Sequence, residues 1–160
     1  RCRWSTAVRA TRRGASPNAP AFFWMHRRHA ASRRHLATHL PLGGLPALRA
    51  KSLTLTDLFI EAVEEGCPGM FDQLTPRGPA RRSALVCLTP TAKLPAGCGQ
   101  AIVQALIDSN VVCGFHAADA EQPDTLRFGF APLYLTHENA LQAAYHLRDI
   151  LLKKEFMAFA

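Results

Sequence analysis

The sequence predicts an α+β domain that begins near residue 46, with a short sheet and helices packed mainly on one face of that sheet. Three observations support this fold class. Apolar residues recur at helical spacing in three stretches, apolar runs of strand length separate these stretches, and glycine or proline bounds most of the runs. The helices are expected at residues 46–65, 99–109 and 136–154, and the strands at residues 83–88, 111–115 and 125–130.

The first helix has a clear start and a clear stop. Pro46 suits the first turn of a helix, and Gly66 with Pro68 supplies the end. Residues 67–82 are then expected to form a loop that leads through a basic turn into the first strand. The apolar side chains near helical spacing, which are expected to pack against the sheet, are Leu48, Leu55, Leu58, Phe59, Ala62 and Val63.

The other two helices show similar signals. Asn110 follows the second helix and is expected in the left-handed conformation that often ends one. Thr136 is expected to cap the last helix, with Glu138 in its first turn and Lys153 and Lys154 near its negative end. The expected core residues are Ile102, Val103, Leu106 and Ile107 of the second helix and Leu141, Ala144, Leu147 and Leu151 of the last.

The N-terminal segment differs in composition from the rest of the chain. Residues 1–46 contain nine arginines and no lysine, aspartate or glutamate, whereas the remainder carries ten basic and twelve acidic side chains. The segment has no helical or strand period, so residues 1–45 are expected to be disordered, ahead of a domain over 46–156 and a tail over 157–160. Its origin has four interpretations: a wrong reading frame, a mitochondrial presequence starting at Met25, a nucleic-acid-binding arm, or a metal tract. The histidines of such a tract are His26, His29, His35 and His39.

The cysteines do not form a recognisable framework. They are odd in number, and no Cys-x-x-Cys pair occurs, which argues against a disulfide scaffold or a closed zinc site and fits a reducing compartment. Cys87 and Cys113 lie on apolar strands and are expected to be buried thiols, not nucleophiles. No apolar run approaches the roughly 18 residues that a membrane-spanning helix needs.

The most informative stretch is residues 126–134, which holds one charge, Arg127, in an otherwise apolar run. Because side chains alternate along a strand, Arg127 and Gly129 share one face, where a carboxylate could approach the backbone. The opposite face carries Leu126, Phe128 and Phe130. A guanidinium in such a setting needs an anionic partner. That partner is either an internal aspartate or glutamate or the carboxylate of a ligand, and the local sequence leaves both open.

Residues 126–134 resemble the C-terminal signature of kynureninases, Leu-Arg-Phe-Gly-Phe-Thr-Pro-Leu-Tyr, and depart from it only at Ala131. Residues 48–59 resemble a second family segment, Leu-Arg-Ala-Lys-Ser-Leu-x-Leu-Thr-Asp-Leu-Phe. The resemblance covers roughly residues 46–156. It is weaker at residues 82–87, where the family usually has Arg-Gly-Ser-Gln-Val-Ser, and at Cys113, Gly114 and His116.

The resemblance implies the small C-terminal domain of a pyridoxal-phosphate enzyme with the aspartate aminotransferase fold. It also implies that Arg127 binds the α-carboxylate of the substrate. Complete enzymes of this family are usually homodimers that hydrolyse L-kynurenine or 3-hydroxykynurenine to L-alanine and anthranilate or 3-hydroxyanthranilate in tryptophan catabolism. A cytoplasmic location is expected, or a mitochondrial one if the N-terminal segment is a presequence. The rival interpretation is a non-catalytic α+β module with a basic arm that binds nucleic acid.

The cofactor requires groups that are hard to find in this sequence. Pyridoxal phosphate needs a lysine for its Schiff base, an acid beside its pyridinium nitrogen and a phosphate cradle. The lysines are Lys51, Lys93, Lys153 and Lys154, and none is expected to be buried next to an acid. His116 is expected in a solvated loop, without an acid–base role. Because the family's cofactor lysine lies upstream of the matched region and the chain starts at Arg1, we expect an inactive fragment that holds the substrate-carboxylate half of the site.

Overall fold

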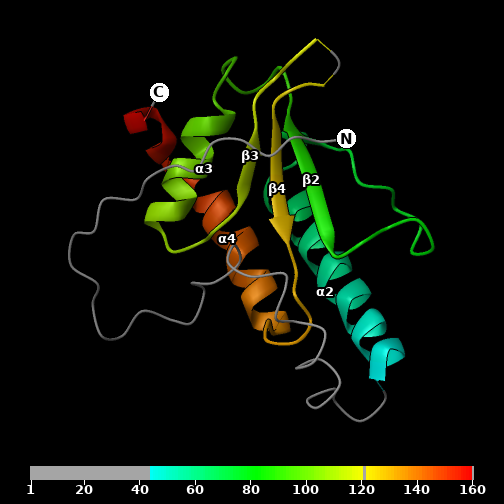
Figure 1. Cartoon of the computed structure of the whole chain (residues 1–160). Helices are drawn as coiled ribbons and strands as arrows, with labels where there is room; N and C mark the ends of the chain where they lie inside the picture. Colours follow the sequence, from blue (N-terminus) through cyan, green and yellow to red (C-terminus); the bar gives the residue numbers. More distant parts are fainter. Residues whose placement is uncertain (1–43, 121, 160) are drawn as a thin grey trace, which may run out of the picture.

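The computed structural model describes residues 44–120 and 122–159 of the chain. They form two layers, a four-stranded sheet and a set of helices on one face of it, so the predicted α+β class is confirmed (Figure 1). The helices are α2 (Gly44–Gly66), α3 (Gly99–Asp108) and α4 (His137–Lys153), and a short 3₁₀ helix, η1 (Glu155–Phe159), follows α4. The strands are β1 (Phe71–Gln73), β2 (Leu85–Pro90), β3 (Gly114–His116) and β4 (Thr125–Gly129).

The sheet has the order β1-β2-β4-β3, and all its neighbouring strands are antiparallel. Strand β4 therefore lies between β2 and β3. Arg127 of β4 is opposite Cys87 of β2 and Gly114 of β3, and Phe128 is opposite Val86. Because residues directly opposite each other in a ladder point to the same side, this register divides the sheet into two chemically different faces.

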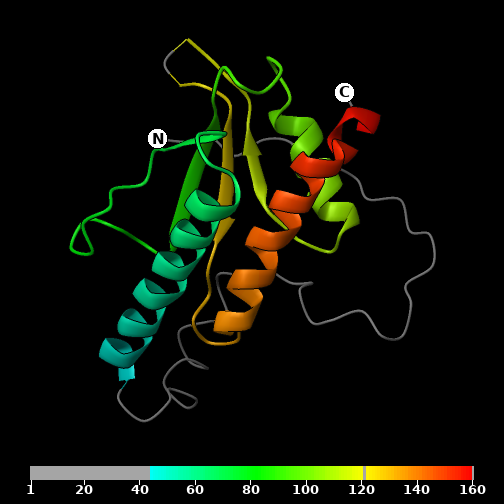
Figure 2. The same cartoon turned by 180° about the vertical axis from the view of Figure 1, so that it is seen from behind.

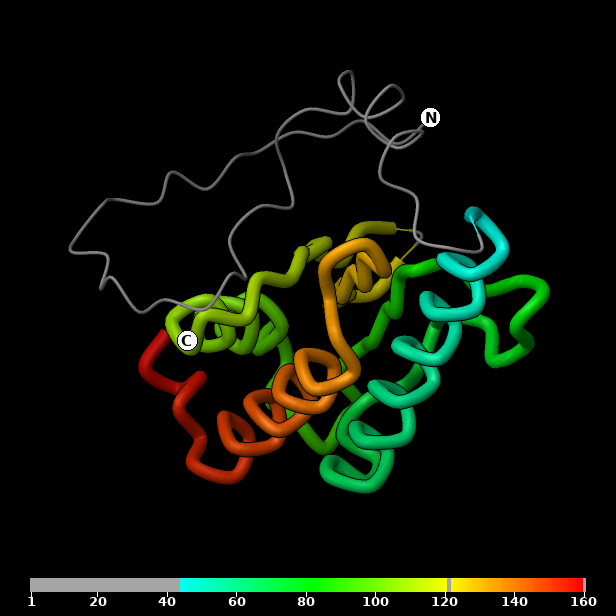
Figure 3. Tube along the Cα trace, turned by 90° about the horizontal axis from the view of Figure 1, so that it is seen from below, coloured from blue at the N-terminus to red at the C-terminus, as the bar shows by residue number. Residues whose placement is uncertain are grey.

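The apolar face of the sheet packs against the helices. The ring of Phe59 in α2 contacts the rings of Phe128 and Phe130, with centroid separations of 4.7 and 5.0 Å. Ala144 and Leu147 of α4 belong to the same buried core. Figures 2 and 3 show α2 and α4 side by side on this face, with α3 at one flank. Burial of these side chains is the main term that stabilises the domain.

The predicted helices are confirmed to within two residues at each end. Around the start of α4, the hydroxyl of Thr136 accepts the Asn139 N–H at 3.2 Å, and the Asn139 side chain accepts the Thr136 N–H at 2.9 Å. This reciprocal pair satisfies two of the donors that a helix start leaves free. Asn110 follows α3 with the expected positive φ of 62°. The caps thus behave as local chemistry predicts.

The helix faces differ in part from the prediction. Ile107 of α3 was expected in the core, but the residue is 39% exposed, because it lies one step around the helix from the buried Leu106. In α4, Leu141 and Leu151 are only half-buried, and alanines take the closest positions to the neighbouring elements. Small side chains let helix axes approach, which displaces the larger leucines to the edge of the contact. The buried residues of α4 are Ala140, Ala143, Ala144, Leu147 and Ile150.

Three further segments correct the prediction. Residues 67–82 contain strand β1, which has no apolar period and exists because it pairs with β2. Strand β3 begins at Gly114, not at Val111, because the Val111 N–H donates to the Leu106 carbonyl and so still belongs to the end of α3. Helix η1 buries Phe156 where no element was predicted.

The expectations for residues 1–43 lie outside the described residues. They include the disorder of the segment, the presequence from Met25, the nucleic-acid arm and the histidine tract. The division into 1–45, 46–156 and 157–160 stays a prediction. In the part of the chain that the structure describes, no helix is long and apolar enough to cross a membrane.

Candidate functional site

The candidate site lies on the sheet face that the helices leave uncovered. We call this surface the open face and define it by the residues whose register puts them opposite the helix layer. Figure 1 views the sheet from this side, and Figure 2 shows α2 and α4 lying across the other. The open face consists of Asp72 of β1, Leu85, Cys87 and Thr89 of β2, Thr125, Arg127 and Gly129 of β4, and Gly114 and His116 of β3.

Arg127 occupies the middle of the open face on the central strand. Its neighbours across the ladder are Cys87 and Gly114, and Gly129 is the next residue on the same side of β4. A Cβ atom built on Gly114 would lie 3.5 Å from the Arg127 Cβ, so the glycine leaves that flank of the arginine open. Small neighbours therefore surround a long cationic side chain, which gives an anion access to it.

The guanidinium of Arg127 has no internal counterion within residues 44–120 and 122–159. The described ion pairs join other residues, and no described hydrogen bond involves the Arg127 side chain. The side chain is half-buried, so it keeps some contact with solvent. The local sequence left two possible partners for Arg127, an internal aspartate or glutamate or the carboxylate of a ligand. None of the described aspartates and glutamates forms a described ion pair with Arg127. A half-buried guanidinium without a partner is suited to bind a carboxylate in bidentate geometry.

A second arginine, Arg82, forms a buried internal ion pair of the kind that Arg127 lacks. The side chain of Arg82 is 2% exposed, pairs with Asp57 of α2 and donates to the Arg77 carbonyl at 3.2 Å. Arg49 donates to the Pro79 carbonyl at 2.6 Å and also to the carbonyl of Arg82. These bonds hold the loop before β2 against α2 and so fix the start of a strand that flanks Arg127. Sequence reasoning missed this pair, because Arg82 and Asp57 are 25 residues apart and no local pattern links them.

Other contacts fix the end of β4. The Phe130 N–H donates to the Ala84 carbonyl at 2.7 Å, which extends the pairing with β2 by one residue. Lys51 of α2 donates its ammonium group to the Pro132 carbonyl at 2.9 Å. The backbone that follows Arg127 is thus tied to both β2 and α2. A binding side chain on a rigid strand loses less entropy when a ligand binds.

His116 lies in a different environment from the expected solvated loop. It is the last residue of β3, pairs with Thr125 of β4 and is half-buried on the open face. Its Nε2 is 3.9 Å from a carboxylate oxygen of Asp119, and its Nδ1 is buried without a hydrogen-bond partner in the described part of the chain. This placement corrects the prediction. The strand brings the imidazole to the face that carries Arg127, which the sequence around His116 does not indicate.

The described lysines do not fit the attachment of pyridoxal phosphate. Lys51 is engaged with the Pro132 carbonyl, and Lys93 is exposed and donates to the Pro68 carbonyl at 3.3 Å. Lys153 forms an exposed pair with Glu155 at 3.7 Å, and Lys154 ends α4 with an exposed side chain. None of them belongs to the strands that form the open face. The described residues therefore hold no cofactor anchor, and we assign them no step of the cofactor's chemistry.

The described cysteines, Cys67, Cys87, Cys98 and Cys113, are free thiols. Burial raises the pKa of Cys67 to about 11 and that of Cys113 to about 12, so these thiols stay protonated at neutral pH. Cys113 is buried, as predicted. Cys87 was also expected to be buried, but it is only half-buried, because its position in β2 turns it to the open face.

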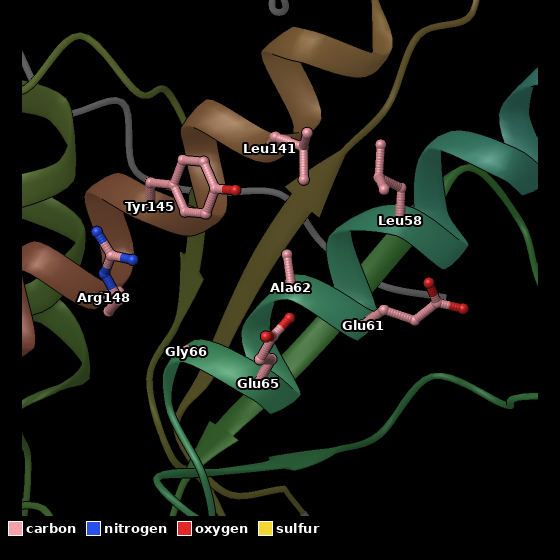
Figure 4. A pocket seen from close by; sticks show the side chains of 8 residues that line it. All are labelled: Leu58, Glu61, Ala62, Glu65, Gly66, Leu141, Tyr145 and Arg148. Carbon is pink, nitrogen blue, oxygen red and sulfur yellow. The ribbon is translucent and has the colours of Figure 1, made fainter.

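A groove between α2 and α4 lies on the outer side of the helix layer, away from the open face (Figure 4). Arg148 in this groove lies over the ring of Tyr145 at 5.1 Å and hydrogen-bonds Asp149, its neighbour in the chain, at 2.9 Å. No nucleophile and base meet there. Among the described residues, no three histidine, cysteine, aspartate or glutamate side chains gather as a metal site would require. The groove is lined by Leu58, Glu61, Ala62, Glu65, Gly66, Leu141, Tyr145 and Arg148.

The family model and the relatives that match this chain agree on one family. Residues 48–147 match the family model of the kynureninase C-terminal domain. The chain is 40% identical over 111 residues to the kynureninase of Pseudomonas fluorescens, which covers 69% of this chain and 24% of that protein. It is 38% identical over 106 residues to the kynureninases of Burkholderia mallei (strain SAVP1) and Burkholderia pseudomallei (strain K96243), covering 66% of this chain and 23% of each relative. The chain thus spans about a quarter of the length of these relatives.

Proposed function

The chain belongs to the kynureninase C-terminal domain family, and from this we propose that it provides the part of a kynureninase that binds the substrate carboxylate. In this proposal Arg127 forms two parallel hydrogen bonds with the α-carboxylate of L-kynurenine or 3-hydroxykynurenine. The rest of the active site, with pyridoxal phosphate and its lysine, belongs to the longer part of the relatives' chains that this chain does not match.

One observation carries the proposal. Arg127 presents a half-buried guanidinium on the open face, and no described carboxylate pairs with it. Taking a guanidinium partly out of water costs free energy that a counterion offsets. A planar guanidinium matches the two oxygens of a carboxylate better than an ammonium does. A carboxylate ligand is therefore the partner that this setting supports best.

The reaction itself depends on groups beyond the described residues. In the complete enzyme, hydrolysis of the Cβ–Cγ bond of kynurenine yields L-alanine and anthranilate, and pyridoxal phosphate supplies the electron sink for that chemistry. The contribution of this chain is to hold and orient the substrate through its carboxylate. A homodimer in the cytoplasm, as in the family, goes with this proposal. By itself, with added pyridoxal phosphate, the 160-residue chain is expected to release no anthranilate from L-kynurenine.

The role of Arg127 can be tested in a complete enzyme. Residues 48–147 would replace the matching segment of the Pseudomonas fluorescens kynureninase, and Arg127→Lys would be compared with the unaltered chimera. Lysine keeps the charge but cannot form the bidentate contact, so kcat/KM is expected to fall by about 10²- to 10³-fold, or about 3–4 kcal/mol of transition-state stabilisation.

The control is Arg148→Lys, which changes an arginine on α4 that contacts Asp149 and the Tyr145 ring, away from the open face. This variant is expected to leave kcat/KM within about twofold, because exposed pairs contribute little. Cofactor absorbance and the melting temperature are expected to be the same in both variants. A large loss of stability in Arg127→Lys with unchanged kinetics in the folded fraction would refute the substrate-binding role.

A further inference from the structure

We propose that Lys51 of α2 is a positioning residue for the carboxylate site at Arg127. Its ammonium group holds the turn that follows β4, and through this turn it keeps the backbone of Arg127 in the orientation that binds a carboxylate. The inference rests on the proposed function of Arg127. It gives a role to residues 48–59, the other stretch that resembles the kynureninase family.

Three polar side chains of residues 48–59 contact loops at the ends of the sheet strands. Arg49 and Asp57 hold the loop before β2 against α2. Lys51 contacts the turn after β4 instead, where its Nζ donates to the Pro132 carbonyl at 2.9 Å. Pro132 belongs to the C-terminal stretch that carries the family resemblance, so this bond joins the two stretches that identify the family.

Strand β4 is paired on both of its sides only as far as Arg127. Gly114 of β3 is opposite Arg127, and among the described strands the residues of β4 that follow pair with β2 alone. One of these residues is Gly129, whose backbone has more conformational freedom than that of any residue with a side chain. The orientation of Arg127 therefore depends on the contacts that hold the chain beyond this glycine.

Two hydrogen bonds hold the chain just beyond Gly129. The Phe130 N–H donates to the Ala84 carbonyl at 2.7 Å, and the Pro132 carbonyl accepts the bond from Lys51. The bond from Lys51 has a cationic donor in a half-buried position, and such bonds are stronger than those between neutral groups. Helix α2 is packed into the core along most of its length, so it is a rigid base for this anchor.

The turn that Lys51 holds leaves two large apolar side chains outside the core. Leu133 is 50% exposed and Tyr134 is 54% exposed, and the Leu135 N–H closes the turn by donating to the Ala131 carbonyl at 3.1 Å. Loss of the bond from Lys51 is therefore expected to leave the core and the melting temperature nearly unchanged, while it loosens the backbone after Arg127. This expectation separates a positioning role from a purely structural one.

The local effect is measured by amide hydrogen exchange in the full 160-residue chain. Lys51→Met removes the donor and keeps a long side chain. It is expected to speed the exchange of the Phe130 and Leu135 amides about 3- to 10-fold, as the loss of one hydrogen bond would. The Cys87 amide, which donates to the Thr75 hydroxyl at 2.8 Å, is expected to exchange at the same rate in both chains.

The functional effect is measured in the chimera with the Pseudomonas fluorescens kynureninase. Lys51→Met is expected to raise KM for L-kynurenine about 3- to 10-fold and to leave kcat within about twofold, because Arg127 spends less time in the binding orientation. Lys51→Arg keeps a cationic donor and is expected to restore KM to within about twofold. The matched control is Lys93→Met, which replaces a lysine that donates to the Pro68 carbonyl at 3.3 Å in the loop after β2. This control is expected to leave KM unchanged.

The outcomes distinguish this inference from the proposed function. An unchanged KM in Lys51→Met, together with the expected loss in Arg127→Lys, would overturn the role of Lys51 and leave Arg127 as the carboxylate site. Unchanged exchange of the Phe130 and Leu135 amides would overturn it without the chimera. A loss of stability and of kcat that Lys51→Arg does not restore would also overturn it, since the bond would then be structural only. An unchanged kcat/KM in Arg127→Lys would refute the proposed function together with this inference.

Discussion

Replacing Arg82 with methionine is expected to destabilise the domain, whereas the same replacement of Arg127 is expected to leave its stability nearly unchanged. Arg82→Met removes the ion pair with Asp57 and the hydrogen bond to the Arg77 carbonyl. Asp57 is 50% exposed and regains water when its partner is lost, which reduces the cost. We expect a loss of about 2–3 kcal/mol in the free energy of unfolding. Arg127→Met breaks no described bond and is expected to cost less than about 0.5 kcal/mol.

The measurement is urea unfolding of the full chain, followed by far-ultraviolet circular dichroism at a fixed ionic strength. In thermal unfolding, the same difference corresponds to roughly 8–20 °C for Arg82→Met and less than about 4 °C for Arg127→Met. The slope of free energy against urea is expected to be the same in both variants, since neither changes the surface exposed on unfolding.

Replacing Asp57, the other member of the ion pair, is expected to have a larger effect than replacing Arg82. Asp57→Asn leaves the 2% exposed guanidinium of Arg82 without a counterion, so it is expected to cost about 3–5 kcal/mol, more than Arg82→Met. Glu64→Gln breaks the exposed pair with Arg77 and is the control, with an expected cost below about 1 kcal/mol. A loss in Arg127→Met as large as that in Arg82→Met would refute the reasoning, because it would reveal an internal counterion for Arg127.

Three further predictions follow from the packing and the thiols. Phe59→Ala removes the ring that contacts β4 in the core and is expected to cost about 3–5 kcal/mol in urea unfolding, whereas a loss below 1 kcal/mol would contradict the assigned core. Thr136→Ala removes the cap of α4 and is expected to cost about 1 kcal/mol, with Thr136→Ser close to the unaltered chain. At pH 8, a thiol reagent is expected to modify Cys87 before Cys67 and Cys113, because burial raises the pKa of the latter two to about 11 and 12. Peptide mapping checks this order, and equal rates for Cys87 and Cys113 would contradict it.

The sequence by itself determined the elements that local chemistry controls. Helices α2, α3 and α4 follow from apolar spacing and from their end signals, because these depend on residues within one or two turns. The two faces of β4 follow from strict alternation, with Phe128 buried and Arg127 half-buried on the other side. The family also follows from the sequence, since the residues around Arg127 carry its signature and the family match confirms it.

The tertiary structure decided which residues meet. Strand β1 has three residues and no apolar alternation by which the sequence could reveal it. It forms because its backbone hydrogen-bonds to the edge of β2. The identity of the structural arginine depended on long-range contacts: Arg82 meets Asp57 across 25 residues, whereas Arg127 meets no described carboxylate. No local pattern encodes such a difference, because it arises from where two distant segments cross.

The composition of the open face was likewise a tertiary result. Thr89, His116 and Arg127 come from three strands, and only the order β2-β4-β3 and its register bring them to one patch. His116 looked like a loop residue because β3 is three residues long and its neighbours give no period. Pairing with β4 decided the structure around His116, because the hydrogen bonds to β4 set both the conformation of β3 and the side to which the imidazole points.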